Sequence, residues 1–351
     1  MARSESDGAP EGLRPLDGRC SPVWELDLLR DCGCGCLACP QGRPEETAPQ
    51  ASFDDYARSR APTRNAFNSP DGLGLNRRLP DQIQTWVRSL GDDRPPFVTV
   101  GHTTEPLPGF AEAEEVLDQC LRLLLEASIG VSLQTRRLMP ERILDTLAEH
   151  ASLARVTLPL PTLSDAELKI WEPGTALVNR RLWNVQQLRL RRVPVTVSVK
   201  PLIPYVNDDR AHLGPLVRGL ADVGVGRLTA EFMRLTPAVH ARLEARSPVS
   251  TQLIFGAYVQ RELDRRLDQT CANLDRRRSV YRLLANLAAE RRTKFSLCRC
   301  ADPALGRQSC GLWPADGATP TPSRQERART RRRPLRSAAQ VGFSDFLDTK
   351  Q

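Results

Sequence analysis

Short runs of β-forming residues alternate with amphipathic segments of helical periodicity between residues 21 and 236. Six strands are expected, at Val23–Leu29, Phe97–Gly101, Gly130–Gln134, Arg155–Pro159, Val195–Lys200 and Arg227–Phe232. Five helices are expected, at Asp81–Leu90, Glu112–Glu126, Pro140–His150, Leu177–Arg191 and Leu213–Val223. This alternation is typical of βα units around a parallel sheet. Because the strands are too few for a closed TIM barrel, we predict an α/β fold built as a partial (β/α)6 TIM-like barrel.

The barrel is expected to occupy residues 21–247. The leader, 1–20, is polar and lacks the apolar centre of a secretory signal, so we expect it to be disordered. Residues 248–313 are expected to form a helical and cysteine-rich C-terminal extension, and residues 314–351 a disordered basic tail. No apolar run reaches the roughly 18 residues of a transmembrane helix. A cytoplasmic protein that does not bind membranes is therefore expected.

Four of the ten cysteines lie in the stretch WELDLLRDCGCGCLACPQG, which includes the first expected strand. In a reducing cytosol, clustered thiols more often bind metal or carry out redox chemistry than form disulfides. Cys32, Cys36 and Cys39 have the spacing C-x3-C-x2-C. Three thiolates on one short loop can each bind one iron of a cubane cluster and leave the last iron open. Cys34 is an additional thiol, so a zinc site is the alternative, although the single-residue spacings make its tetrahedral geometry cramped.

The cysteine spacing and several later segments resemble the radical S-adenosylmethionine (radical SAM) superfamily, in particular its spore photoproduct lyase-like or DNA repair photolyase-like group. The later segments are FVTVGHTTEPLPG, VSLQTRR, WEPGTALVNRRL, KPLIPYVNDD and EFMRLTP, in that order along the chain. The resemblance covers roughly residues 21–240. The chain departs from the family pattern at Ala38, where an aromatic residue is usual, at Glu105, where the family has aspartate, and at Arg136, where it has lysine.

The resemblance implies an enzyme with a barrel of the radical SAM type. Cys32, Cys36 and Cys39 would hold a 4Fe–4S cluster whose open iron binds S-adenosyl-L-methionine. One electron from a reducing partner, such as flavodoxin or ferredoxin, would cleave this cofactor to a 5′-deoxyadenosyl radical that abstracts hydrogen from the substrate. The group includes lyases, and its name suggests damaged DNA as the substrate. Neither the substrate nor the oligomeric state follows from the sequence.

Polar residues near the expected strand ends are candidates for contacts with S-adenosyl-L-methionine. These candidates are Thr103, Thr104, Glu105, Arg136, Glu172 and Arg181. The forked guanidinium groups of Arg136 and Arg181 suit the carboxylate of the cofactor. The threonines and Glu105 could meet its ammonium group or polar substrate atoms, and Glu172 the ribose hydroxyls or Arg181. Ion pairs and helix caps without any ligand contact are the alternative for each.

Lys200 and His102 are the candidate catalytic residues. Lys200 ends the fifth expected strand in a chain that contains only four lysines, so we expect it near the substrate. A salt bridge to Asp208 or Asp209 is the alternative. His102 follows the second expected strand and could act as an acid or a base, or make a structural hydrogen bond.

A second group of cysteines, Cys298, Cys300 and Cys310, lies in a loop of the C-terminal extension. With Cys271 or Cys34 as a fourth ligand, this group could hold an auxiliary iron–sulfur cluster or a zinc ion. Reduced thiols without a metal are the alternative.

The net charge of +8 and the pI of about 9.2 are compatible with a nucleic-acid partner. An arginine-rich composition caused by codon bias explains the same charge without one. If both cysteine groups bind zinc, the alternative function is a zinc-stabilised nucleic-acid-binding protein without catalysis.

Overall fold

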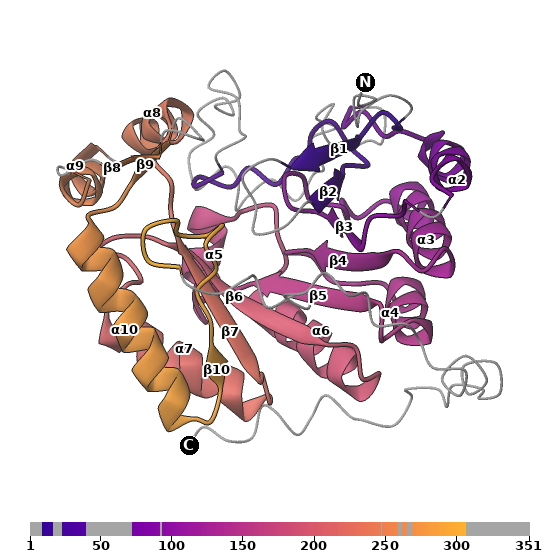
Figure 1. Cartoon of the computed structure of the whole chain (residues 1–351). Helices are drawn as coiled ribbons and strands as arrows, with labels where there is room; N and C mark the ends of the chain where they lie inside the picture. The colour runs from indigo at the N-terminus through magenta and orange to yellow at the C-terminus, as the bar shows by residue number, and fades with distance from the viewer. Residues whose placement is uncertain are drawn as a thin grey trace. The chain divides into compact units, whose positions relative to one another are not determined.

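A mostly parallel sheet forms the centre of the fold (Figure 1). The computed structural model describes residues 9–16, 23–39, 72–91, 93–246, 248–258, 262–264 and 269–306. In these residues, eight strands follow the order β1-β2-β3-β4-β5-β6-β7-β10. Their bounds are β1 Leu13–Leu16, β2 Val23–Leu26, β3 Phe97–Val100, β4 Gly130–Gln134, β5 Ala154–Pro159, β6 Val195–Leu202, β7 Arg227–Phe232 and β10 Lys294–Phe295. The β1–β2 pair is antiparallel and the other pairs are parallel.

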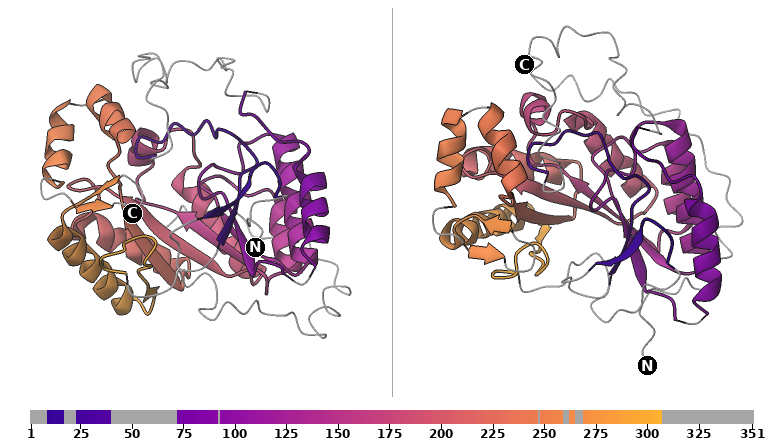
Figure 2. Two further views of the ribbon diagram at one scale, coloured as in Figure 1. Left: turned by 45° about the horizontal axis from the view of Figure 1, so that its top comes forward. Right: turned by 90° about the horizontal axis from the view of Figure 1, so that it is seen from above.

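Helices follow most of the parallel strands. Their bounds are α2 Leu79–Ser89, α3 Ala111–Glu126, α4 Glu141–Glu149, α5 Asp165–Trp171, α6 Val178–Leu190, α7 Arg210–Asp222, α8 Pro237–Arg246, α9 Pro248–Gly256 and α10 Leu274–Glu290. Helices α2, α3, α4, α6, α7 and α10 lie along one face of the sheet, as Figures 1 and 2 show. A separate antiparallel pair is formed by β8 (Glu262–Asp264) and β9 (Gln269–Cys271). None of the helices in the described ranges has the length and apolar character needed to cross a membrane.

The two faces of the sheet differ in polarity, because side chains alternate between faces along each strand. The face toward the helices is apolar and contains Val98, Val131, Leu133, Val156, Val197 and Leu228, all buried. In register on the other face lie Glu25, Thr99, Ser132, Gln134, Thr157, Thr196, Ser198 and Lys200. A polar inner face suits a sheet that surrounds a polar ligand better than one packed around an apolar barrel core.

The fold class predicted from the sequence is confirmed. All six expected strands and all five expected helices are present, with their ends shifted by a few residues, and the sheet does not close into a complete barrel. The helical part of the C-terminal extension is present as α9 and α10.

Two edge strands differ from the expectation. Leu13–Leu16 form β1 inside the leader that we expected to be disordered, because Leu13 is buried and pairs with Leu26 of β2. The extension contributes β10, which pairs with β7 and widens the parallel sheet. The described residues belong to one compact unit, Met1–Pro320. The boundary between 21–247 and 248–313 stays a prediction, and residues 314–351 lie outside the described residues.

Candidate functional site

The first cysteine loop, Cys32–Cys39, follows β2 at the carboxyl edge of the sheet. Gly33 and Gly35 have φ angles of 59° and 60°, in the left-handed region that glycine adopts without strain. These two glycines let the chain turn sharply between successive cysteines. The carboxyl ends of parallel strands are where barrel enzymes carry their chemistry.

Two neighbouring segments hold this cysteine loop. Gly174, in the segment between α5 and α6, donates from its amide to the Cys34 carbonyl at 2.9 Å. A Cβ at Gly174 would lie only 2.7 Å from the same oxygen, so a larger residue would push the loop away. Arg242 of α8 donates to the carbonyls of Leu37 and Cys39. The loop is therefore fixed from both the α5–α6 segment and α8.

Three of the four thiols of this loop are linked through Cys34. Cys34 is buried and is hydrogen-bonded to the side chains of both Cys32 and Cys36. The hydrogen bond with Cys34, together with burial, raises the pKa of Cys32. For Cys34, the hydrogen bond with Cys32 lowers the pKa, but the hydrogen bond with Cys36 and burial outweigh it and raise the pKa. The sequence suggested Cys34 only as a zinc ligand or as a fourth ligand for the second cysteine group; in the structure it links the thiols of Cys32 and Cys36.

The donor set suits a thiophilic metal or an iron–sulfur cluster. Thiolates are the ligands that iron–sulfur clusters and zinc take in proteins. The Cys39 amide donates to the Cys36 carbonyl at 3.1 Å, so the end of the loop turns back toward its middle. Across the described ranges, no three His, Cys, Asp or Glu side chains are yet arranged as a metal-ligand set. A cluster would have to draw the thiols around itself as it binds.

Glu105 is a buried carboxylate beside this loop. It follows β3, and its side chain accepts hydrogen bonds from the Thr135 hydroxyl and from the amides of Arg136, at 2.7 Å, and Leu107, at 3.3 Å. Burial raises the pKa of Glu105, although these hydrogen bonds and the nearby arginines oppose the rise. The Glu105 backbone is hydrogen-bonded to the Cys32 side chain. Glu105 thus ties the ends of β3 and β4 to the cysteine loop.

Glu172 holds the two arginines predicted to bind a carboxylate. Its side chain accepts from Arg136 Nε at 3.0 Å and from Arg181 Nη2 at 2.6 Å, and Glu172 is 3% exposed. Arg181 also donates to the Ala176 and Pro159 carbonyls and to the Thr175 hydroxyl. All three nitrogens of Arg181 are therefore occupied by the protein. Its predicted contact with a ligand stays a prediction, one that this arrangement does not favour.

Arg136 is better placed to meet a ligand. Only its Nε has a partner in the described residues, and its side chain is 24% exposed. Burial lowers the pKa of Arg136, but the negative charges of Glu172, Cys36 and Glu105 outweigh that effect and raise it. Arg136 thus presents two free guanidinium nitrogens close to Cys36.

Lys200 extends across the polar face of the sheet. Its Nζ donates to Gln134 Oε1 of β4 at 2.7 Å, and Gln134 Nε2 donates to the Gly101 carbonyl at 3.0 Å. Between them in β5, Thr157 has a buried hydroxyl without a partner among the described residues. His102 is half-buried directly after Gly101. The structure therefore brings Lys200 toward the strand end that His102 follows, while Asp208 pairs with Arg276 and Asp209 caps α7.

The sequence interpretation missed a group of charged residues around β1 and β2. Arg14 Nη2 donates to Glu25 at 3.1 Å and to Asp27 at 2.8 Å. The Thr103 amide donates to Glu25 at 2.7 Å, and the Thr104 hydroxyl donates to Asp27, also at 2.7 Å. Both threonines, predicted to meet a ligand, are thus engaged by these carboxylates. The signal in the sequence was WELDLL, which places two acidic residues on one face of a strand.

The charge environment of Asp27 is unusual. Burial, and to a lesser extent the negative charge of Glu25, raise the pKa of Asp27 to about 6. The hydrogen bond from Thr104 and the charge of Arg14 act in the opposite direction. Asp27 therefore titrates close to neutral pH, which suits a group that exchanges protons.

The second cysteine group lies after β10. The Cys300 amide donates to Cys298 Sγ at 3.1 Å. Arg234 connects this segment to Cys271, because its Nη1 donates to Cys271 Sγ at 3.5 Å and its Nη2 to the Ala301 carbonyl at 2.8 Å. Of the two predicted fourth ligands, Cys271 is the one that Arg234 links to this segment. Cys310 lies outside the described residues, so a metal site here stays a prediction.

No protein-family model matches the sequence, and no curated protein matches it. Solved structures of spore photoproduct lyase do match the fold. A cysteine-to-serine mutant of that enzyme has a TM-score of 0.52 at 15% identity, covering 64% of this chain and 67% of the other. The enzyme complexed with dinucleoside spore photoproduct has a TM-score of 0.51 at 15% identity, with the same coverage.

A further mutant of spore photoproduct lyase, solved with bound AdoMet and dinucleoside spore photoproduct, has a TM-score of 0.51 at 14% identity, again covering 64% of this chain and 67% of the other. At such low identity, the comparison concerns the arrangement of the backbone. Over the 64% of the chain that these comparisons cover, the fold is similar to that of spore photoproduct lyase.

Proposed function

We propose that this protein is a radical SAM enzyme. The observation that carries the proposal is the position of the cysteine loop: in a fold shared with spore photoproduct lyase, the loop follows β2 at the carboxyl edge of the sheet, and Cys34 links the thiols of Cys32 and Cys36. When bound, a 4Fe–4S cluster and S-adenosyl-L-methionine would supply one-electron cleavage of the sulfonium and hydrogen abstraction from a substrate. The electron would come from a reducing protein such as flavodoxin or ferredoxin.

The residues of this chain would hold these groups. Cys32, Cys36 and Cys39 would bind the cluster through thiolates. Arg136 would bind the carboxylate of S-adenosyl-L-methionine, because its two free nitrogens form a fork that matches a carboxylate. Glu172 would keep Arg136 in that orientation through its bond to Nε.

We propose damaged DNA as the first substrate class to test. The support is the net charge of +8 and the bound dinucleoside spore photoproduct in a structure of similar fold. Lys200 on the polar face of the sheet is the residue we propose to contact it, since Lys200 Nζ lies against Gln134 at the end of β4. Activity as a lyase and a cytoplasmic location stay predictions.

The proposal is tested by anaerobic purification followed by iron and sulfide quantification. The wild type should be brown, should bleach with dithionite, and should release 5′-deoxyadenosine from S-adenosyl-L-methionine under reduction. Cys36→Ala should lose iron and product together. Cys120→Ala is the matched control, since Cys120 is a buried thiol of α3 remote from the loop in sequence and should keep both. Colourless protein that contains zinc and no iron would instead establish the zinc-binding alternative.

The same measurement addresses the second cysteine group. A Cys298→Ala/Cys300→Ala variant should lose part of the bound metal and retain the cluster of the first loop. Equal metal content in this variant and the wild type would rule out an auxiliary cluster or zinc ion there.

A further inference from the structure

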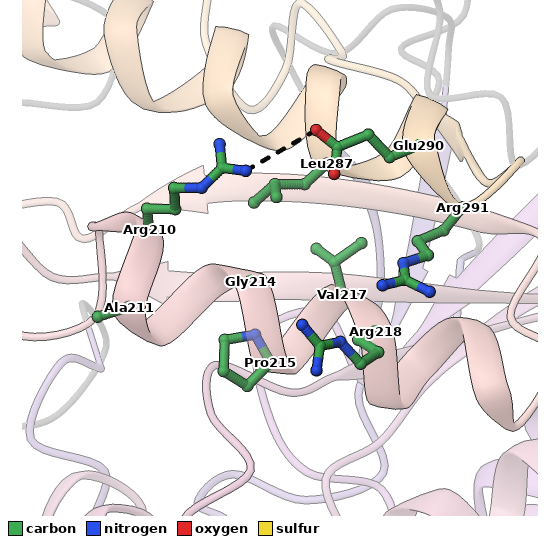
Figure 3. Close-up of a pocket in the computed structure, with 9 residues that line it drawn as sticks. All are labelled: Arg210, Ala211, Gly214, Pro215, Val217, Arg218, Leu287, Glu290 and Arg291. Carbon is green, nitrogen blue, oxygen red and sulfur yellow. Dashed lines mark ion pairs between the residues drawn. The ribbon is translucent and has the colours of Figure 1, made fainter.

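A groove of about 270 Å³ lies between α7 and α10, and none of its residues belongs to the site described above (Figure 3). Its lining residues are Arg210, Ala211, Gly214, Pro215, Val217, Arg218, Leu287, Glu290 and Arg291. Val217 and Leu287 are buried and give the groove an apolar floor. The three arginines and the single glutamate are exposed along its sides. The groove therefore combines a small apolar floor with an excess of positive charge.

The arginines at the two ends of the groove are in different situations. Arg210 makes a long ion pair with Glu290, at 3.9 Å, in which the side chains are 68% and 54% exposed. Figure 3 shows Arg218 and Arg291 at the end away from Arg210, one from α7 and one at the end of α10. Neither has an ion pair or side-chain hydrogen bond with any described residue. Two guanidinium groups of like charge thus share one end of the groove, and neither is paired with a carboxylate of the described residues.

Gly214 forms part of the wall of the groove. It lies inside α7, where glycine is less favourable than alanine because it loses more backbone freedom on folding. A Cβ at this position would meet no atom within 4 Å, so no neighbouring group requires a glycine there. Gly214 therefore leaves open space in the wall of the groove, between Arg210 and Arg218 (Figure 3).

We propose that the groove binds a phosphate group, carried by a free phosphate ester or by a nucleic-acid backbone. The oxygens of a phosphate group point in tetrahedral directions and can accept from guanidinium groups on two sides. The volume of about 270 Å³ is slightly below that of pockets for drug-sized ligands, about 300–1,000 Å³, so it suits a phosphate and the atoms next to it. This site is independent of the cysteine loop, and its failure would leave the radical SAM proposal untouched.

The test measures binding by the full-length protein at constant ionic strength. Inorganic phosphate is titrated by calorimetry, and a fluorescein-labelled single-stranded oligodeoxynucleotide by fluorescence anisotropy. We expect Arg218→Gln/Arg291→Gln to weaken binding at least tenfold. Arg88→Gln/Arg180→Gln is the matched control, because it removes the same charge from two exposed arginines elsewhere, and it should change affinity less than twofold.

A third variant separates the shape of the groove from its charge. Gly214→Leu keeps every arginine and fills the space, and it should also weaken binding at least tenfold while its melting temperature stays close to that of the wild type. If the groove variants lose affinity for both probes, the phosphate belongs to a nucleic-acid backbone. If they lose affinity for inorganic phosphate alone, it belongs to a free phosphate ester. The proposal is overturned if the wild type binds neither probe, if the control pair loses as much affinity, or if Gly214→Leu binds normally.

Discussion

Replacing Glu172 by glutamine tests how much the buried charges beside the cysteine loop stabilise the fold. Glu172 is 3% exposed and accepts hydrogen bonds from Arg181 at 2.6 Å and from Arg136 at 3.0 Å. Glutamine has nearly the same shape but no charge. Its amide nitrogen would face one of the two guanidinium groups, which are themselves donors only.

The expected loss follows from the burial of Arg181. Removing one partner of a buried ion pair costs about 3–5 kcal/mol, because the other charge stays buried without compensation. Arg181 is 1% exposed, but it keeps its bonds to Pro159, Thr175 and Ala176. We therefore expect the lower end of that range, about 3 kcal/mol. With an unfolding entropy of about 2.1 cal/mol/K per residue, such a loss lowers the melting temperature of a 351-residue protein by roughly 4 °C.

The assay is urea unfolding followed by circular dichroism, on reduced protein without added cofactors. The matched control is Glu290→Gln, whose exposed pair with Arg210 spans 3.9 Å and should be worth less than about 0.5 kcal/mol. A loss below about 1 kcal/mol for Glu172→Gln, or the same loss in both variants, would refute the reasoning that burial makes the Glu172 pairs strong.

Three further predictions concern the cysteine loop, Asp27 and α7. Cys34→Ala should retain the iron and 5′-deoxyadenosine formation that Cys36→Ala loses; if iron analysis shows that Cys34→Ala also loses the cluster, the ligand assignment is wrong. Because the pKa of Asp27 is raised to about 6, the folded protein keeps a proton that the unfolded chain releases at lower pH. As the pH rises from about 4 to 6, the free energy of unfolding of the wild type should therefore fall relative to that of Asp27→Asn, by up to roughly 3 kcal/mol. If urea unfolding shows the same pH dependence of this free energy in both proteins, the prediction is wrong. Gly214→Ala should raise the free energy of unfolding by about 0.5–1 kcal/mol, since the added Cβ meets no atom within 4 Å, and a lower melting temperature would argue against it.

The strands and helices could be predicted from the sequence because local pattern determines them. Gly130–Gln134 has the residue pattern of a buried strand, and Ala111–Glu126 has the periodicity of an amphipathic helix. Tertiary contacts favour the same secondary structure in both segments. β1 could not be found in this way, because its four residues lie in a polar leader and gain their partner only when β2 is beside them.

The sequence predicted where the site residues lie in the fold better than it predicted their contacts. Counting residues placed the cysteine loop after the first strand and Glu105 after the second, as the structure shows. Contacts between segments far apart in the chain were not accessible, and so the enclosure of Arg181 and the link between Arg14 and Asp27 were missed. The groove between α7 and α10 could not be predicted for the same reason, because no local sequence pattern shows that Arg218 and Arg291 lie close together.

The pairing of Lys294 with Arg227 has a consequence for how the chain folds during its synthesis. Until β10 and α10 have been synthesised, the outer edge of β7 presents unpaired amide and carbonyl groups, which can recruit strands of other molecules. A chain shortened before Lys294 would keep that edge permanently bare and should aggregate, even though every segment around the cysteine loop would be intact.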